Sequence, residues 1–206
     1  MIIKNKRLLK VISYILVFAL TVTTLIPANI AYASEAVTDQ TETEWYNFRN
    51  NQENNGVTDR ETPIELNETT LKWAHKYGTG YAAAPTPPVI VGGKLYIAMS
   101  NVVVEIEKET GEILRQSTPM AANVGYATNP PLYADGKLFV QIGNGMIQAV
   151  DIETMKAVWH TEKIGGQTIS PISYTKVGDA GYIYLGTWTG ESKDGVLICA
   201  TTDNSN

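Results

Sequence analysis

The stretch that decides the fold is PPVIVGGKLYI at residues 87–97, because it returns as PPLYADGKLFV at residues 130–140, an offset of 43. A third copy starts at Ser170-Pro171, carries three extra residues, and reaches the 43-residue register again at Gly181. No helical periodicity interrupts these units. A period near 43 with short strands separated by Gly, Pro, Asn and Asp is typical of a β-propeller blade.

The second copy shows how one unit is built. Pro130-Pro131 ends the incoming loop and permits only an innermost strand to follow, since proline cannot donate to a central ladder. Asp135-Gly136, like Gly92-Gly93 in the first copy, suits a two-residue hairpin with positive φ. Later strands are expected at 138–142, 146–150 and 156–160, and the last of these is the outermost.

The N-terminal 33 residues predict a signal peptide. Residues 1–10 carry four cations and no acid, residues 11–26 are almost entirely apolar, and Ala31-Tyr32-Ala33 forms a cleavage site. The alternative is a retained membrane anchor, but the apolar run is shorter than the roughly 20 residues that span a bilayer. We therefore expect cleavage after Ala33, no remaining transmembrane anchor, and a secreted or cell-surface protein of bacterial origin.

The charge of the mature chain disfavours one class of partner. Beyond residue 33 the chain has 12 Lys and Arg against 21 Asp and Glu, a net charge of −9. Nucleic-acid binding requires clustered cations, so we expect no nucleic-acid partner. With 44% apolar residues and one cysteine, the composition also excludes a disulfide scaffold and a wholly disordered chain.

Residues 149–159, AVDIETMKAVW, carry a family resemblance. The stretch resembles the A-x-D-x-x-T-G-x-x-x-W tryptophan-docking motif of the pyrroloquinoline-quinone (PQQ)-like repeat β-propeller family. It matches at Ala149, Asp151, Thr154 and Trp159, and Met155 replaces the glycine. The resemblance implies that the tryptophan packs between neighbouring blades while Asp151 and Thr154 organise the turn before the outer strand.

The motif is weaker elsewhere along the chain. In the preceding copy Thr110-Gly111 is kept, but Glu105 and Arg115 stand where alanine and tryptophan would be, and Glu107 replaces the aspartate. Trp73 looks like the outer-strand tryptophan alone. The stretch WYNFRN at residues 45–50 is similar to the W-x-x-F-R opening of such propellers, so the resemblance covers residues 45–206.

The same resemblance raises the question of a quinoprotein dehydrogenase. Such an enzyme implies a vicinal disulfide, a Ca²⁺ site of Glu, Asn and Asp, and a catalytic Asp. The single Cys199 cannot form a vicinal pair, and it aligns with Ala149, which predicts a packed thiol. We therefore expect no catalytic residue, metal or cofactor. PQQ with calcium belongs only to the alternative, a fragment of a PQQ-dependent oxidoreductase.

A third alternative is the outer-membrane-assembly propeller of Gram-negative bacteria. It shares the fold but is normally a lipoprotein, and no cysteine lies near the predicted cleavage site. The two histidines, His75 and His160, follow tryptophans on expected outer strands, where a solvent-facing role is favoured over a metal site.

The candidate binding residues lie in loops that join an outer strand to the next inner strand, at 77–87, 117–130 and 164–170. Tyr81 and Tyr126 each stand in a Gly-Tyr-Ala, Gln167 takes the corresponding place, and Trp188 lies in an enlarged turn at 186–195. Aromatics on one rim predict a contact surface for a protein, peptide or glycan. The alternative is that each tyrosine packs on its neighbouring blade.

Strand counting predicts an all-β propeller of four-stranded antiparallel blades with an incomplete ring. The expected parts are a signal peptide at 1–33, a flexible lead-in at 34–44, an outer strand at 71–76, blades at 87–116 and 130–163, and a partial blade at 170–203. About three blades are too few to close a ring. Either the chain is the N-terminal part of a longer surface protein, which the exposed edges favour, or two chains form a six-bladed homodimer.

Overall fold

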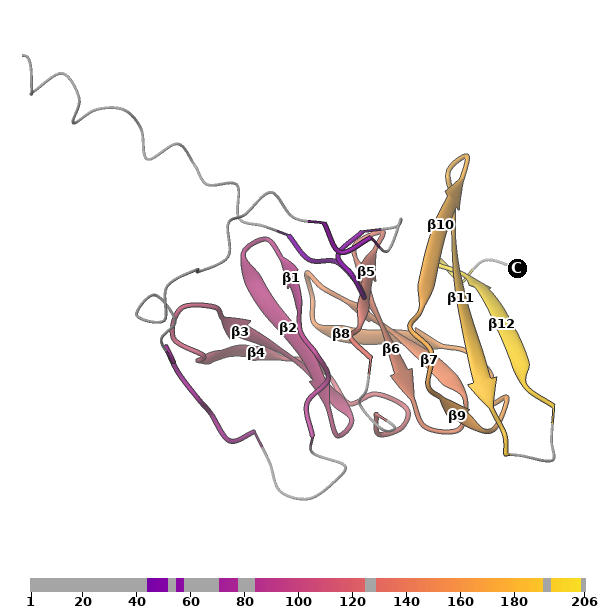
Figure 1. The fold of residues 1–206 in the computed structure, drawn as a ribbon, viewed down its shortest axis with the longest axis horizontal. Coiled ribbons are helices and arrows are strands. Elements are labelled where there is room, and N and C mark those ends of the chain that lie inside the picture. Colours follow the sequence, from indigo (N-terminus) through magenta and orange to yellow (C-terminus); the bar gives the residue numbers. More distant parts are fainter. Residues whose placement is uncertain are drawn as a thin grey trace, which may run out of the picture. The chain divides into compact units, whose positions relative to one another are not determined.

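The computed structural model describes residues 44–51, 55–57, 71–77, 84–124, 129–190 and 194–204. These residues contain twelve strands and no helix, arranged as three antiparallel sheets (Figure 1). The all-β, blade-like fold class is therefore confirmed. The predicted signal peptide at 1–33 and all but the last residue of the lead-in at 34–44 lie outside the described residues.

The first sheet follows the chain in the order β1-β2-β3-β4. Its strands are β1 (Val89–Val91), β2 (Lys94–Met99), β3 (Val102–Glu107) and β4 (Ile113–Gln116). Gly92 and Gly93 join β1 to β2 with φ values of 55° and 71°, as the glycine pair predicts. The prolines at 87 and 88 precede an edge strand, where no ladder donor is missed.

The second sheet repeats the first, in the order β5-β6-β7-β8. Its strands are β5 (Leu132–Ala134), β6 (Lys137–Ile142), β7 (Met146–Asp151) and β8 (Lys156–His160). Asp135 and Gly136 form the first turn at φ 47° and 74°, and Asn144 and Gly145 the second at 67° and 71°. The two-residue turn predicted from Asp135-Gly136 is confirmed.

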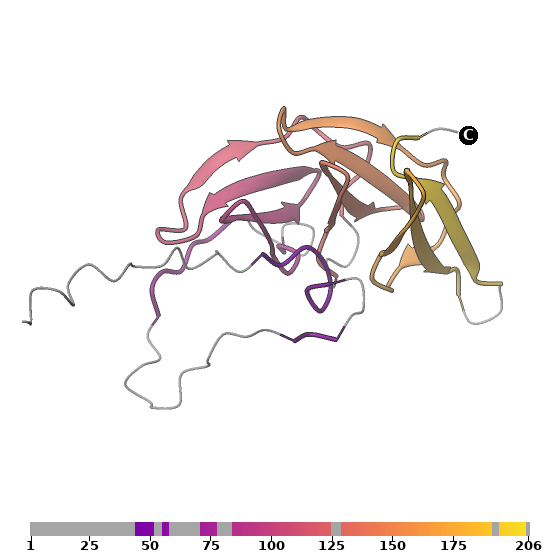
Figure 2. The same ribbon diagram turned by 90° about the horizontal axis from the view of Figure 1, so that it is seen from above.

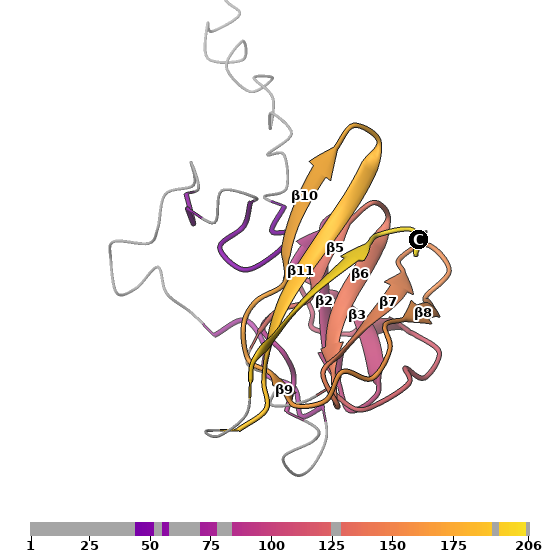
Figure 3. The same cartoon turned by 90° about the vertical axis from the view of Figure 1, so that its right-hand side faces the viewer.

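The third sheet contains β10 (Ser173–Val177), β11 (Ala180–Trp188) and β12 (Val196–Thr201) in that order. A two-residue strand, β9 (Gln167–Thr168), pairs with the end of β11. Figure 3 shows β10 and β11 as a long hairpin. Because β9 supplies ladder partners to Thr187 and Trp188, β11 continues into the region predicted as an enlarged turn.

The core lies between sheets, which follow one another in chain order (Figure 2). One apolar cluster joins the first and second sheets through Val103, Leu138 and Val140, and another joins the second and third through Phe139 and Ile183. Neighbouring residues of β6 thus face opposite clusters, so this sheet is buried on both sides. Within the described residues the three blades do not close a ring.

Residues 71–77 differ from the outer strand predicted at 71–76. The structure assigns no strand there. Instead, the segment lies against the turn between β3 and β4 and is held by side chains, with Tyr77 Oη donating to Gly111 O at 3.3 Å. Since its bonds run to a turn, the segment has no ladder partner among the described strands.

Cys199 also differs from its prediction, because its side chain is exposed. Its counterpart Ala149 is fully buried between the second and third sheets. Ile198 faces that same inter-sheet core, and the alternation of a strand therefore turns Cys199 to the far face of the third sheet. Leu197, two residues before it in the same strand, is likewise exposed, at 74%.

Candidate functional site

Gln167 and Trp188 form the described part of a rim at one end of the blades. They are directly opposed in the β9–β11 pair, so the structure brings these two predicted residues together. Gln167 was expected in a loop but belongs to β9, because β11 extends far enough to pair with it. The Trp188 side chain is 46% exposed. The exposed Trp188 ring thus lies directly beside Gln167.

Tyr81 and Tyr126, the other two predicted rim residues, lie outside the described residues. The segment that follows Tyr81 and the segment that precedes Tyr126 are both held by hydrogen bonds at this same end of the sheets. Thr86 exchanges hydrogen bonds of 2.9 Å with Ala98, through both its amide and its hydroxyl. Val124 N donates to Ser100 O at 2.6 Å, which holds the loop after β4 against the β2–β3 turn.

Trp73 docks on the β3–β4 turn of the first blade. Its indole Nε1 donates to Lys108 O at 2.9 Å. A Cβ on Gly111 would lie 2.6 Å from the indole ring, and φ at Gly111 is 75°. Glycine is therefore required here both for the close approach of the ring and for the backbone conformation.

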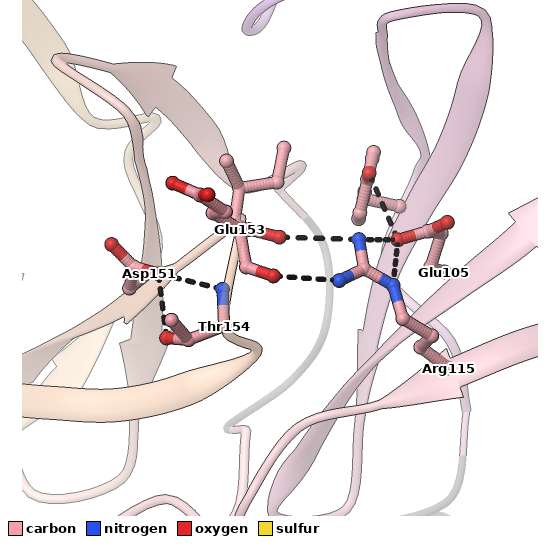
Figure 4. A network of polar contacts seen from close by, with 7 residues as sticks. Glu105, Arg115, Asp151, Glu153 and Thr154 are labelled. Atoms are coloured by element: carbon pink, nitrogen blue, oxygen red, sulfur yellow. Dashed lines mark hydrogen bonds and ion pairs between the residues drawn. The ribbon is translucent and has the colours of Figure 1, made fainter.

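Arg115 takes the same place between the first and second blades (Figure 4). Its Nη1 donates to Glu153 O at 2.8 Å and its Nη2 to Ile152 O at 3.2 Å. Ile152 stands three residues before Met155, as Lys108 does before Gly111. Met155 keeps the left-handed conformation, with φ 54°, and its side chain is buried in the core between these blades.

Glu105 is the buried anchor of that arginine. Only 6% of the residue is exposed, and its Oε2 accepts from Arg115 Nε at 2.7 Å, from Arg115 Nη2 and from Tyr96 Oη at 3.1 Å. Burial, together with the Glu105 carboxylate, raises the pKa of Tyr96 to about 12. The hydrogen bond to Glu105 raises the pKa of Arg115, so the guanidinium of this cluster stays charged.

Asp151 and Thr154 close the turn before β8. The Asp151 carboxylate accepts from Thr154 N at 2.8 Å and from Thr154 Oγ1 at 2.6 Å (Figure 4). These two bonds lower the pKa of Asp151. The carboxylate is thus ionised at neutral pH and accepts its hydrogen bonds from within its own turn.

Trp159 packs between the second and third blades. Its ring lies 5.7 Å from Phe139, centroid to centroid, and it covers the apolar cluster shared with the third sheet. In contrast to Trp73, its buried Nε1 has no hydrogen-bond partner within the described part of the chain.

The described residues include both histidines and the single cysteine of the chain. Among them, no three His, Cys, Asp or Glu side chains are grouped so as to hold a metal ion. The chain has one cysteine, so the vicinal disulfide implied for the dehydrogenases cannot form. His160 Nδ1 lies 2.8 Å from Thr161 O and His75 Nε2 lies 3.1 Å from Thr110 O, so both imidazoles contact backbone.

Sequence reasoning missed a second set of side chains, which gathers where residues 44–51 meet the inner strands. A cavity of about 250 Å³ lies there, and Tyr46, Asn47, Tyr133, Asp135 and Tyr174 are among its lining residues. The only available signal was the W-x-x-F-R-like stretch at 45–50. That stretch marks where the segment lies but not which side chains it brings together.

Three antiparallel blades joined by docking side chains define the class as a PQQ-like β-propeller. Residues 62–196 match the family described as outer membrane protein assembly factor BamB, a family of PQQ-type repeats. The match covers more than half of the chain, and the protein therefore belongs to this family. A comparison with curated proteins gives no match.

A solved structure with a TM-score above 0.5 supports the fold. A europium-containing methanol dehydrogenase aligns with a TM-score of 0.59 at 19% identity, over 80% of this chain and 31% of that one. The quinohemoprotein alcohol dehydrogenase of Comamonas testosteroni aligns with a TM-score of 0.45 at 19% identity, over 75% of this chain and 27% of that one. The chain thus spans less than a third of either dehydrogenase. At these identities the likeness concerns the fold alone.

Proposed function

We propose that the protein is an exported, non-catalytic β-propeller that serves as a binding or scaffolding module at the cell surface. The observation that carries the proposal is the exposed Trp188 beside Gln167 at one end of the blades. A large aromatic next to an amide suits contact with a protein, a peptide or a glycan. Tyr81 and Tyr126 extend the same surface in this proposal.

Three carboxylates already accept hydrogen bonds from other side chains of the protein, and this supports a binding role over a catalytic one. Glu105 accepts from Tyr96 and Arg115, Asp151 from Thr154, and Asp135 from two hydroxyl groups of the third blade. A general acid or base needs a free hydrogen-bonding position toward a substrate. The description of the matching family also names an assembly factor.

The location and the partner class follow from the leader sequence and the charge. The basic, apolar segment at 1–33 supports export, and the net charge of −9 beyond it disfavours nucleic acid. Within the described residues, no helix is long and apolar enough to cross a bilayer.

The test uses retention of the exported chain on insoluble bacterial cell walls and on immobilised surface proteins. Trp188→Ala and the pair Tyr81→Ala with Tyr126→Ala are each expected to lower retention at least fivefold. Val177→Ala is the matched control, because Val177 is also exposed but lies at the other end of the third sheet. Equal retention of rim and control variants, each still folded, contradicts the proposed function.

The non-catalytic part of the proposal has its own test. Titration of the protein with PQQ and Ca²⁺ is expected to give no cofactor absorbance that remains after gel filtration. Stoichiometric retention of the quinone at micromolar cofactor would instead support the oxidoreductase fragment.

A further inference from the structure

Residues 44–51 are fixed to the inner strands by backbone bonds. Trp45 N donates to Ile90 O at 3.0 Å, and Ile90 N donates to Trp45 O at 2.8 Å. Tyr133 N donates to Tyr46 O at 2.7 Å, so the segment bridges β1 and β5 (Figure 1). The Glu44 carboxylate also accepts from Gly92 N at 3.0 Å. The segment therefore forms one wall of a built site.

The cavity that results is small and mixed in character. Its volume of about 250 Å³ corresponds to roughly eight water molecules, below the pockets of about 300–1,000 Å³ that hold drug-sized ligands. Tyr46, Tyr133 and Tyr174 supply aromatic rings from the segment, from β5 and from β10. A single ring-sized ligand fits this space better than a quinone cofactor or a folded peptide.

Asn47 gives the cavity a buried hydrogen-bond acceptor that lacks a donor in the part of the chain that the structure describes. The residue is 5% exposed and lines the cavity, and its Oδ1 has no hydrogen-bond partner among the described residues. A buried acceptor left unpaired destabilises the folded protein. A ligand that donates a hydrogen bond to this oxygen would remove that destabilisation, so the site selects a donor.

The carboxylate of the cavity is already engaged. Asp135 Oδ1 accepts from Tyr174 Oη at 3.0 Å and Oδ2 accepts from Thr202 Oγ1 at 2.6 Å. A Cβ on Gly181 would lie 2.1 Å from Oδ2, so glycine makes room for this contact. The aspartate thus joins the second blade to the third, and both of its carboxylate oxygens already accept hydrogen bonds.

Two phenols of the cavity, those of Tyr46 and Tyr174, have raised pKa values. Burial, with the charge of Glu44, raises the pKa of Tyr46, and burial, with the hydrogen bond to Asp135, raises the pKa of Tyr174. The rings of Tyr46 and Tyr133 lie 5.2 Å apart at 41°, and Tyr46 is 39% exposed, so its ring is accessible. Aromatic faces and a neutral amide acceptor suit the C–H face and hydroxyl groups of a sugar.

We propose that this cavity binds one neutral pyranose unit of a glycan, with the sugar ring against Tyr46 and Tyr133 and a hydroxyl donating to Asn47 Oδ1. The site is separate from the rim. Gly181, beside Asp135, lies near the start of β11, whereas Trp188 ends it, which places the two regions roughly 23 Å apart at about 3.3 Å per residue. The inference does not depend on the proposed function of the rim.

The test is saturation-transfer NMR of the purified chain with methyl glucopyranoside, methyl galactopyranoside and N-acetylglucosamine as probes. Asn47→Leu keeps the size of the side chain and removes the unpaired amide. We expect it to bind at least tenfold more weakly while unfolding at the same temperature or higher, because an unsatisfied buried group has been removed. Tyr46→Ala is expected to lose binding as well.

Two controls separate the possible outcomes. Tyr182→Ala removes a tyrosine of β11 that does not line the cavity, and Trp188→Ala removes the rim aromatic; both are expected to bind the sugars as the unmodified protein does. Nα-acetyl-lysine amide is the cationic probe, and no binding is expected. Unchanged affinity in Asn47→Leu, loss in Trp188→Ala, preference for the lysine probe, or no sugar binding by the unmodified chain overturns the proposal.

Discussion

The docking contacts on the first and second blades have the same geometry but use different side chains, an indole in one and a guanidinium in the other. Trp73 lies on Gly111 and donates to Lys108 O, whereas Arg115 lies beside Met155 and donates to Ile152 O. Both acceptors are carbonyls three residues before a residue of positive φ. The contact is therefore specified by a backbone acceptor, and an indole or a guanidinium can meet it.

The difference continues into the blades themselves. In the second blade Ala149 stands opposite Trp159, and Phe139 packs on that ring. In the first blade Glu105 stands opposite Arg115, and Tyr96 donates to the carboxylate. An apolar trio thus corresponds to a charged trio. This teaches that the docking positions change as a group, since a buried carboxylate is stable only beside its donors.

The largest effect is expected for Arg115→Ala. The change leaves the buried Glu105 carboxylate with Tyr96 as its remaining side-chain donor. Because the Arg115 side chain is itself 43% exposed, the expected loss is that of a buried acceptor deprived of a donor, about 1–3 kcal/mol. Urea unfolding followed by tryptophan fluorescence measures it. Arg115→Lys, which cannot donate in the same forked geometry, is expected to recover less than half. A loss in the free energy of unfolding below about 0.5 kcal/mol would contradict this prediction, because it would show that the pair contributes no more than an exposed ion pair.

Next in size is the exchange of the whole charged group for the apolar one. Arg115→Trp alone is expected to be strongly destabilising, because a Cβ beneath the corresponding Trp73 would lie 2.6 Å from its ring. We expect the combination of this change with Tyr96→Phe, Glu105→Ala and Met155→Gly to be less destabilising than the sum of the four single changes. The difference in the free energy of unfolding should be about 2 kcal/mol. Additive free energies of unfolding would show that these four positions are independent.

Gly111→Ala is expected to weaken docking of the 71–77 segment. The new Cβ would lie 2.5 Å from His75 and 2.6 Å from Trp73, at a φ that disfavours a side chain by about 1–2 kcal/mol. Trp73 should become more exposed, with red-shifted emission and faster quenching by iodide. Gly92→Ala, where φ is also positive but nothing lies within 4 Å, isolates the backbone contribution.

A smaller effect separates the two tryptophans. Trp73→Phe loses the hydrogen bond to Lys108 O, while Trp159→Phe loses a donor that has no described partner. The first should therefore cost about 1 kcal/mol more than expected from ring size, and the second nothing beyond it. Equal losses by thermal unfolding would contradict the assignment of these two indole groups.

The smallest effect concerns pH. Hydrogen bonds from Thr154 lower the pKa of Asp151 below its ordinary value of 3.8, so the folded state binds this proton less readily than the unfolded state. The resulting stabilisation is present at neutral pH and is lost as the pH falls through the lowered pKa. Thr154→Val should flatten this acid dependence. An unchanged slope of stability between about pH 5 and 3 would contradict it.

The sequence predicted the blades well because their signals are local. Pro-Pro, Gly92-Gly93 and Asp135-Gly136 fix strand starts and hairpins within a few residues, and the strands follow as expected. Features set by distant partners were predicted wrongly. The segment 71–77 is not a strand, Gln167 is not in a loop, and Cys199 is exposed. Each depends on which surface another part of the chain covers.

The candidate sites divide in the same way. Gln167 and Trp188 could be named from their places in the repeat, although their direct pairing could not. The cavity beside Asn47 could not be named at all, because Tyr46, Tyr133 and Tyr174 come from three segments far apart in sequence. No repeat or motif relates those positions. They are brought together by the hydrogen bonds that join residues 44–51 to the inner strands and by those from the third blade to Asp135.

The pairing of Arg115 with Met155 also limits how blades of this kind can diverge. A methionine cannot be introduced beneath a docked tryptophan, because even the first side-chain carbon would overlap the ring at a contact like that of Gly111. An arginine can be introduced above a glycine, since its backbone acceptors are already present. A route of two substitutions between the two versions therefore passes through arginine with glycine, and the order of those substitutions is fixed by steric exclusion.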